Sequence, residues 1–349
     1  HNSMEEHDPS QIGGLTGLEE EVIAFIQSGG GSFEPLALAV HAHQRANCPP
    51  YDAFCAQFPH PARWQDIPRL PLSAFRHAAI RVFPESGVIR TFRTSGTTGE
   101  GFGQHHLRTT AIYRAAALAG WRRAGLPESE VFCLMATPEE NPHSSLSCMA
   151  GWLAPQERFF SAPWDPLEAA LARARRPVLF GTALAFLDLF EWLGDRSLRL
   201  PEGAIAVETG GYKGTLRSLP KAGLYARFAA QLGLPEHAVW NEYGMTELSS
   251  QFYTQGLNRP HSGPPWTRAI VINPETGTEA ADGETGVLHL WDLANVGSCC
   301  ALQTQDLAIR RGENFELLGR DPAALPRGCS RAADEFLRTG PAPQDPGEN

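Results

Sequence analysis

The sequence contains no apolar run as long as the roughly 18–20 residues that a membrane-spanning helix requires. Only 19% of its residues are charged and the net charge is −10, which argues against a protein that binds nucleic acid through the phosphate backbone. A small anion held by backbone N–H groups is not excluded. The acidic N-terminal stretch MEEHDPSQIGG lacks the apolar core of a signal peptide, so we expect a cytoplasmic protein.

Cysteine spacing typical of metal sites is also missing. The seven cysteines are an odd number, and the adjacent Cys299 and Cys300 suit neither a disulfide nor a tetrahedral metal site. We therefore expect reduced thiols, which leaves thiol chemistry available. The apolar content of 42% is enough for a well-buried core, while 34 glycines and 28 prolines indicate a chain rich in loops.

Hydrophobic patterning predicts alternating strands and helices, followed by a strand-rich part from residue 268. Helices are expected within 16–47, 109–126, 166–175, 183–194 and 224–233, and strands within 78–83, 88–94, 130–137, 177–182, 203–209 and 238–243. This order favours an α/β protein with a mainly parallel, helix-flanked sheet and a smaller β subregion. We interpret residues 1–3 as a cloning remnant, 4–320 as one core domain and 321–349 as a short tail.

Four segments carry candidate chemistry. In RTSGTTG (93–99), the hydroxyls and glycines of Thr94, Ser95, Gly96, Thr97, Thr98 and Gly99 could surround a polyphosphate, although an ordinary structural loop explains the composition equally well. No Gly-Lys-Ser/Thr follows, so this is not a Walker loop. In VETGGYKG (207–214), a slot for a planar base could be formed by Gly210, Gly211 and Tyr212, and the alternative is a plain turn.

The third segment, WNEYGMTELSSQ (240–251), places Tyr243, Gly244, Thr246 and Glu247 after a strand. A carboxylate beside a hydroxyl can hold Mg²⁺ against a phosphate. The alternative is a capping box that opens a helix at Thr246, which is weakened because Ser249 stands where that box requires Glu or Gln. In the fourth segment, 304–328, Asp306 at an expected strand start could accept hydrogen bonds from ribose hydroxyls, and a solvated loop Asp is the alternative.

The order of the four segments resembles the adenylate-forming superfamily, which includes acyl-CoA synthetases, peptide-synthetase adenylation domains and luciferases. TSGTTG is similar to its phosphate loop, ETGGYKG to its adenine-side turn, EYGMTE to its aromatic-x-x-Thr-Glu motif, and QDL with LLGRD to its ribose Asp and hinge, over about residues 55–330. The resemblance implies the fold of the large N-terminal-type domain and the use of ATP and Mg²⁺. It implies that Thr246 contacts the α-phosphate, Glu247 binds the metal, Tyr243 lies against adenine, and Asp306 and Arg320 hold the ribose.

The resemblance also implies an acid-binding region near residues 143–149, 181–186 and 208–212, with the substrate-binding candidates His143, Ser144, Ser145, Gly181 and Thr182. Two features depart from the superfamily. First, Glu100-Gly101-Phe102-Gly103 stands where the superfamily usually has a lysine after the phosphate loop, and the basic residues near it in sequence are Arg93, Arg108, His105 and His106. Second, only 28 residues follow Asp321, where most members have a mobile lid domain that bears a lysine.

A short chain of this kind resembles the LuxE-like acyl-protein synthetases of the bioluminescence fatty-acid reductase system, and ATPEENPHSSLSCM, IPRLPLSAFR, NEYGMTELSSQ and LLGRDPAALPRGCS are similar to that branch. The branch implies self-acylation of a cysteine near the C-terminus and delivery to a reductase. Cys329, close to Arg327, is the candidate acceptor because a guanidinium favours the thiolate. Cys299 and Cys300 are alternatives, and an inert tail cysteine explains Cys329 equally well.

The function expected is therefore ATP-dependent activation of a fatty or aryl acid as an acyl-adenylate, followed by transfer to a thiol. The thiol is Cys329, CoA or the phosphopantetheine of a carrier protein, and the partner is a carrier protein or a reductase subunit, without nucleic acid or membrane. Two alternatives stay open. One is an ATP-independent acyltransferase that moves an acyl group from CoA to a carrier protein, and the other is a non-catalytic nucleotide-binding subunit.

Overall fold

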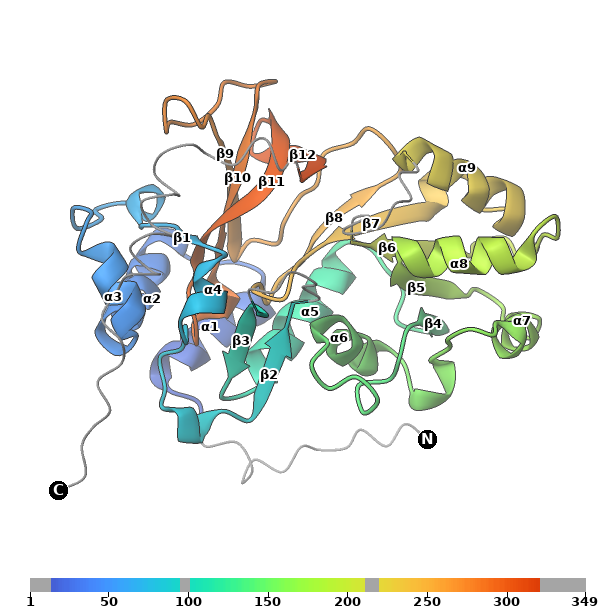
Figure 1. The fold of residues 1–349 in the computed structure, drawn as a ribbon, viewed down its shortest axis with the longest axis horizontal. Coiled ribbons are helices and arrows are strands. Elements are labelled where there is room, and N and C mark those ends of the chain that lie inside the picture. Colours follow the sequence, from blue (N-terminus) through green and yellow to red (C-terminus); the bar gives the residue numbers. More distant parts are fainter. Residues whose placement is uncertain (1–13, 95–100, 211–219, 321–349) are drawn as a thin grey trace.

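A mainly parallel sheet forms one half of the protein in the computed structural model, which describes residues 14–94, 101–210 and 220–320 (Figure 1). Its strands run in the order β4 (Val131–Leu134), β5 (Val178–Thr182), β6 (Ile205–Thr209), β7 (Val239–Tyr243) and β8 (Phe252–Gln255). β4 to β7 are parallel, and β8 pairs antiparallel with β7. The mainly parallel, helix-flanked sheet expected from the sequence is confirmed.

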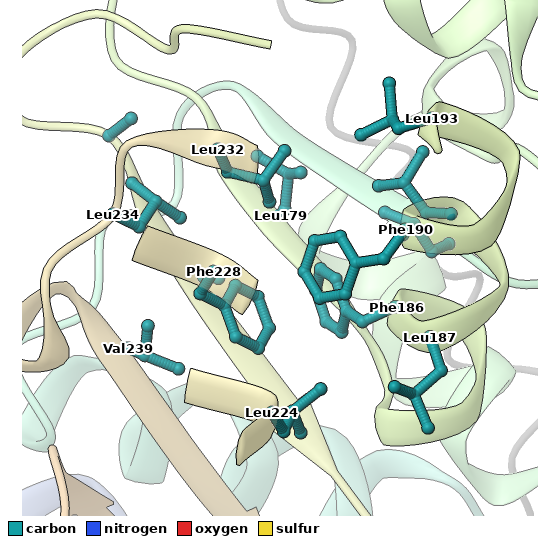
Figure 2. Packing of buried hydrophobic residues seen from close by; sticks show 14 of the residues in the cluster. Leu179, Phe186, Leu187, Phe190, Leu193, Leu224, Phe228, Leu232, Leu234 and Val239 are labelled. Atoms are coloured by element: carbon teal, nitrogen blue, oxygen red, sulfur yellow. The ribbon is translucent and has the colours of Figure 1, made fainter. Parts of the chain in front are cut away.

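Helices cover both faces of this sheet. α8 (Ala183–Leu193) and α9 (Lys221–Leu232) pack on one face, and α5 (Ala111–Arg123) and α6 (Ser145–Leu153) on the other (Figure 1). Strand residues alternate between the two cores, so Leu179 contacts the α8–α9 side while Phe180 contacts the α5–α6 side. Figure 2 shows Phe186 and Phe190 of α8 facing Phe228 of α9 above the sheet.

The strand-rich part forms a second sheet. Its order is β1 (Leu70–Pro71), β11 (Ala301–Arg311), β10 (Thr285–Asp292) and β9 (Thr267–Ile272), and β12 (Asn314–Arg320) pairs with another part of β11. The pairs are antiparallel except β1 with β11. α1 (Gly17–Ser28), α2 (Phe33–Asn47), α3 (Pro49–Cys55) and α4 (Ala74–His77) pack against this half, and α7 (Asp165–Leu171) lies beside the first sheet (Figure 1).

A short hairpin of β2 (Arg90–Arg93) and β3 (Gln104–Leu107) holds both ends of the segment 94–103. The sequence indicated a strand before this segment and a helix after it, but not β3. QHHL has few strand-forming residues, and its alternating burial becomes visible only in the folded protein, where His105 and Leu107 point inward. The described ends of this segment, Thr94 and residues 101–103, therefore lie next to the paired strands of a hairpin that precedes α5.

Other expectations need correction. Residues 78–83 are not a strand: they follow α4 as irregular chain, because the buried Ile80 packs into the core without a neighbouring strand. The patterning also missed β8 and α6, and the Ser144 side chain caps the N-terminus of α6. Within the described ranges, no helix is both long and apolar enough to cross a membrane.

Candidate active site

The turn after β7 carries two of the sequence-predicted residues, Thr246 and Glu247. Gly244 opens the turn, and a Cβ atom there would lie 2.5 Å from Glu242 Oε1, so a larger residue would clash with that side chain. The Leu248 N–H donates to the Met245 carbonyl at 3.1 Å, and no helix begins at Thr246. The capping-box alternative is therefore wrong. The buried Glu247 carboxylate instead belongs to an irregular turn at the carboxyl end of a parallel strand.

The β2–β3 hairpin brings the base of the candidate phosphate loop against this turn. The Thr94 N–H donates to the Gly103 carbonyl at 2.9 Å, and the Gly103 N–H donates to Thr94 Oγ1 at 2.9 Å. A Cβ atom on Gly103 would lie 3.3 Å from Glu247 Oε1, so the carboxylate approaches the backbone closely. The other loop candidates, Ser95, Gly96, Thr97, Thr98 and Gly99, lie outside the described residues.

Tyr243 and Asp306 meet across the two sheets. The Tyr243 hydroxyl donates to Asp306 Oδ2 at 2.6 Å, and the ring lies edge-on against Phe315 and His261. Asp306 lies within β11 and not at a strand start, and it pairs through the backbone with Arg320, the last described residue of β12, whose side chain is not described. The structure thus brings together two residues that are 63 positions apart.

The adenine-side candidates are described only in part. Gly210 follows β6 with φ of +79°, a left-handed conformation that favours glycine, while Gly211 and Tyr212 lie outside the described residues. Beside Gly210, Glu208 accepts hydrogen bonds from the Tyr225 hydroxyl at 3.0 Å and from Asn241 Nδ2 at 2.7 Å. Burial raises the pKa of Glu208. Burial also lowers the pKa of Lys221, and the negative charges of Glu208 and Glu316 oppose that decrease.

A second buried carboxyl, Glu242, lies beside Thr209 on the α5–α6 face of the sheet. Burial raises its pKa to about 7, and a hydrogen bond from the Thr209 side chain opposes the shift. Neither Glu208 nor Glu242 was a sequence candidate. Acidic residues near the ends of otherwise apolar strands were the available signal.

A buried polar network supports the turn from the side of the second sheet. Asp292 accepts hydrogen bonds from the Ser249 N–H at 3.0 Å and from the Ser250 hydroxyl at 2.7 Å, and burial raises its pKa to about 6. Asn295 Nδ2 donates to the Glu247 carbonyl at 2.6 Å, and Asn295 Oδ1 accepts from the Ser249 hydroxyl at 2.7 Å. Neither residue was a sequence candidate, although polar side chains at the end of the apolar run VLHLWDLAN were a signal.

The proposed acid-binding residues lie in two places. His143 is exposed and its Nδ1 contacts the Thr91 carbonyl at 3.0 Å; Ser144 caps α6, and the Ser145 carbonyl accepts from the Tyr113 hydroxyl at 2.8 Å. Gly181 is packed so closely that a Cβ atom would lie 2.9 Å from Leu134 Cβ, and Thr182 caps α8. Each therefore has a structural role that explains it without a substrate.

The six described cysteines are buried free thiols: Cys48, Cys55, Cys133, Cys148, Cys299 and Cys300. Burial raises the pKa of each thiol, to about 11 for Cys148 and about 12 for Cys300, and so disfavours the nucleophilic thiolate. Cys299 and Cys300 are thus poor candidates for an acyl acceptor. Cys329, the first candidate, lies outside the described residues.

Metal ligands are sparse around the turn. In the part of the chain that the structure describes, no group of three or more His, Cys, Asp or Glu side chains could hold an ion. A single carboxylate such as that of Glu247 is a ligand that Mg²⁺ accepts together with phosphate oxygens, so this side chain fits the metal of a bound nucleotide.

Comparison with solved structures identifies the fold. An open conformation of 2-hydroxyisobutyryl-CoA ligase, in complex with 2-HIB-AMP and CoA, matches 89% of this chain and 77% of its own with a TM-score of 0.60 and 16% identity. The chain has the fold of the adenylate-forming enzymes. The structure of McyG A-PCP complexed with phenylalanyl-adenylate matches 70% of this chain and 49% of its own with a TM-score of 0.51 and 16% identity.

Comparison by sequence reaches less far. No family model matches the chain. A curated relative, the long-chain-fatty-acid–luciferin-component ligase of Aliivibrio fischeri, is 28% identical over 97 residues, and the match covers 25% of this chain and 25% of that ligase. The chain therefore matches only about a quarter of that ligase's length. Both comparisons agree with the resemblance to the adenylate-forming superfamily.

Proposed function

We propose that this protein is a ligase that activates a carboxylic acid with ATP as an acyl-adenylate and passes the acyl group to a thiol. The observation that carries the proposal is the meeting of Gly103, at the base of the hydroxyl-rich loop, with the Glu247 carboxylate. The hydrogen bond between Tyr243 and Asp306 adds an aromatic ring and a carboxylate, a pair suited to a nucleoside. Loop N–H groups, a hydroxyl and a carboxylate are the groups that a magnesium nucleotide requires.

Each residue has a role in the proposed first step. An oxygen of the substrate carboxylate attacks the α-phosphorus of ATP, the bond to the β-phosphate bridging oxygen breaks, and pyrophosphate leaves. The Thr246 hydroxyl and the loop N–H groups donate to the α-phosphate oxygens, where negative charge develops. Asp306 and Arg320 hold the ribose, and Tyr243 lies against adenine. Glu247 would hold Mg²⁺, which neutralises phosphate charge when bound.

The second step transfers the acyl group. A thiolate attacks the acyl carbonyl carbon, the bond between that carbon and the phosphate oxygen breaks, and AMP leaves. We favour Cys329 as the thiolate on this chain, because burial suppresses the thiolate of the six described cysteines. CoA or a carrier-protein phosphopantetheine would replace it if Cys329 does not react. The name of the Aliivibrio relative, a long-chain-fatty-acid–luciferin-component ligase, supports a fatty acid as the substrate.

The test is ATP–pyrophosphate exchange with a panel of fatty, aryl and hydroxy acids. We expect exchange that depends on one class of acid and falls at least about 100-fold in Glu247→Gln, because one transition-state contact contributes roughly that factor. Glu157→Gln, a change on an exposed 3₁₀ turn, is the matched control and should exchange at the wild-type rate. A wild type that exchanges with no acid, although it is folded, would refute adenylate formation.

A further inference from the structure

His105 is a buried histidine that the proposed reaction leaves without a role. It lies in β3, only 4% of its surface is exposed, and its two ring nitrogens face two different partners. Nδ1 lies 2.8 Å from the Thr246 carbonyl oxygen, and Nε2 lies 3.1 Å from the Ser298 hydroxyl oxygen. The ring thus connects the hairpin, the candidate catalytic turn and the segment after β10.

The partners determine where the ring proton is. A carbonyl oxygen can only accept, so Nδ1 carries the hydrogen and donates to Thr246, while Nε2 accepts from the Ser298 hydroxyl. Burial lowers the pKa of His105 to about 4, which keeps the ring neutral near pH 7. A neutral ring with one donor and one acceptor satisfies both contacts at once.

The contact with Thr246 joins two parts of the site that are 141 residues apart. β3 begins directly after Gly103, whose backbone lies against the Glu247 carboxylate. The next carbonyl of the turn, that of Glu247, accepts a hydrogen bond from Asn295 Nδ2 at 2.6 Å. Two successive carbonyls of the turn are therefore fixed by separate elements, and His105 provides the attachment on the side of the loop.

We propose that His105 is a positioning residue that sets the place of Thr246 relative to Gly103 and the β2–β3 hairpin during acyl-adenylate formation. The inference rests on the proposed function, since it assigns the contact a role in that reaction. A loss of this contact frees the Thr246 peptide to move relative to the hairpin. A displacement of about 1 Å in such a site can cost roughly 100-fold in rate. A histidine that only fills the core would lower stability but would leave the rate of the folded enzyme unchanged.

Two amide variants separate these roles. In His105→Asn the side-chain NH₂ takes the place of Nδ1 and can donate to Thr246, whereas in His105→Gln it lies near the place of Nε2 and cannot. We expect kcat of the exchange reaction to fall at least about 10-fold in His105→Gln and to stay within about 3-fold of wild type in His105→Asn, with KM for the acid unchanged in both. His106→Leu, which removes the neighbouring ring that contacts Thr91 Oγ1 at 2.9 Å, is the control and should keep the wild-type kcat.

Three results would overturn the inference: wild-type kcat in His105→Gln, equal losses in both amide variants, or an Nε2–H tautomer in ¹⁵N NMR of the wild-type ring near pH 7. The NMR measurement needs no variant, so it decides the contact even if a variant fails to fold. A wild type without exchange refutes the proposed function itself. An active wild type with an unimpaired His105→Gln refutes only the role of His105.

Discussion

Replacement of Glu242 by Gln should change how the stability of the protein depends on pH. The carboxyl is buried at the end of β7, and burial raises its pKa from 4.5 to about 7. The unfolded chain gives up this proton near pH 4.5, whereas the folded protein keeps it until about pH 7. The wild type therefore loses free energy of unfolding as the pH rises between these values, and Gln, which has no such proton, does not.

The size of the effect follows from the two pKa values. At about 1.4 kcal/mol per pKa unit, the difference between 4.5 and about 7 corresponds to about 3 kcal/mol. Urea unfolding of both proteins at pH 5, 6, 7 and 8 measures it. The wild type minus Glu242→Gln difference in unfolding free energy should decrease by about 2–3 kcal/mol over this range, and most other titrating groups cancel in that difference.

A companion variant tests the cause of the shift. Thr209→Val removes the hydrogen bond that favours the charged carboxylate, so the pKa of Glu242 should rise further, as measured by ¹³C NMR of the labelled carboxyl. A difference between wild type and Glu242→Gln that stays constant from pH 5 to pH 8 would refute the reasoning, because it would mean that Glu242 is ionised throughout.

The remaining predictions concern the thiols and the core. Burial raises the thiol pKa of the six described cysteines, so iodoacetamide at pH 8 should label the native protein at Cys329. The six described thiols should react at least about 100-fold more slowly. Labelling at the same rate in Cys329→Ser would contradict this prediction. Phe228→Ala, in the core between α8 and α9 (Figure 2), should cost about 3–5 kcal/mol in urea unfolding, whereas Phe58→Ala, at a side chain that is 44% exposed, should cost less than about 1 kcal/mol. Equal losses in the two variants would show that Phe228 is not a core residue.

The parallel sheet could be predicted because its signals are local. Runs such as VFCL and VLFGT are apolar throughout, as expected of strands covered on both faces, and the spacing of apolar residues in ALAFLDLFEWL marks the helix between them. β3 was not predictable in the same way. Its four residues, QHHL, have a weak intrinsic preference for a strand and become one by pairing with β2.

In the candidate site, too, some features follow from local sequence and others only from the fold. The sequence by itself determined the order of the motifs and the residue types in them, including Thr246, Glu247 and Asp306, because these signals lie within a few consecutive positions. Only the tertiary structure decided which groups meet: Gly103 with Glu247, Tyr243 with Asp306, and His105 with the Thr246 carbonyl. Those contacts join residues 63 to 144 positions apart, and contacts over such distances depend on how the two sheets and the hairpin pack, which no local pattern of residues specifies.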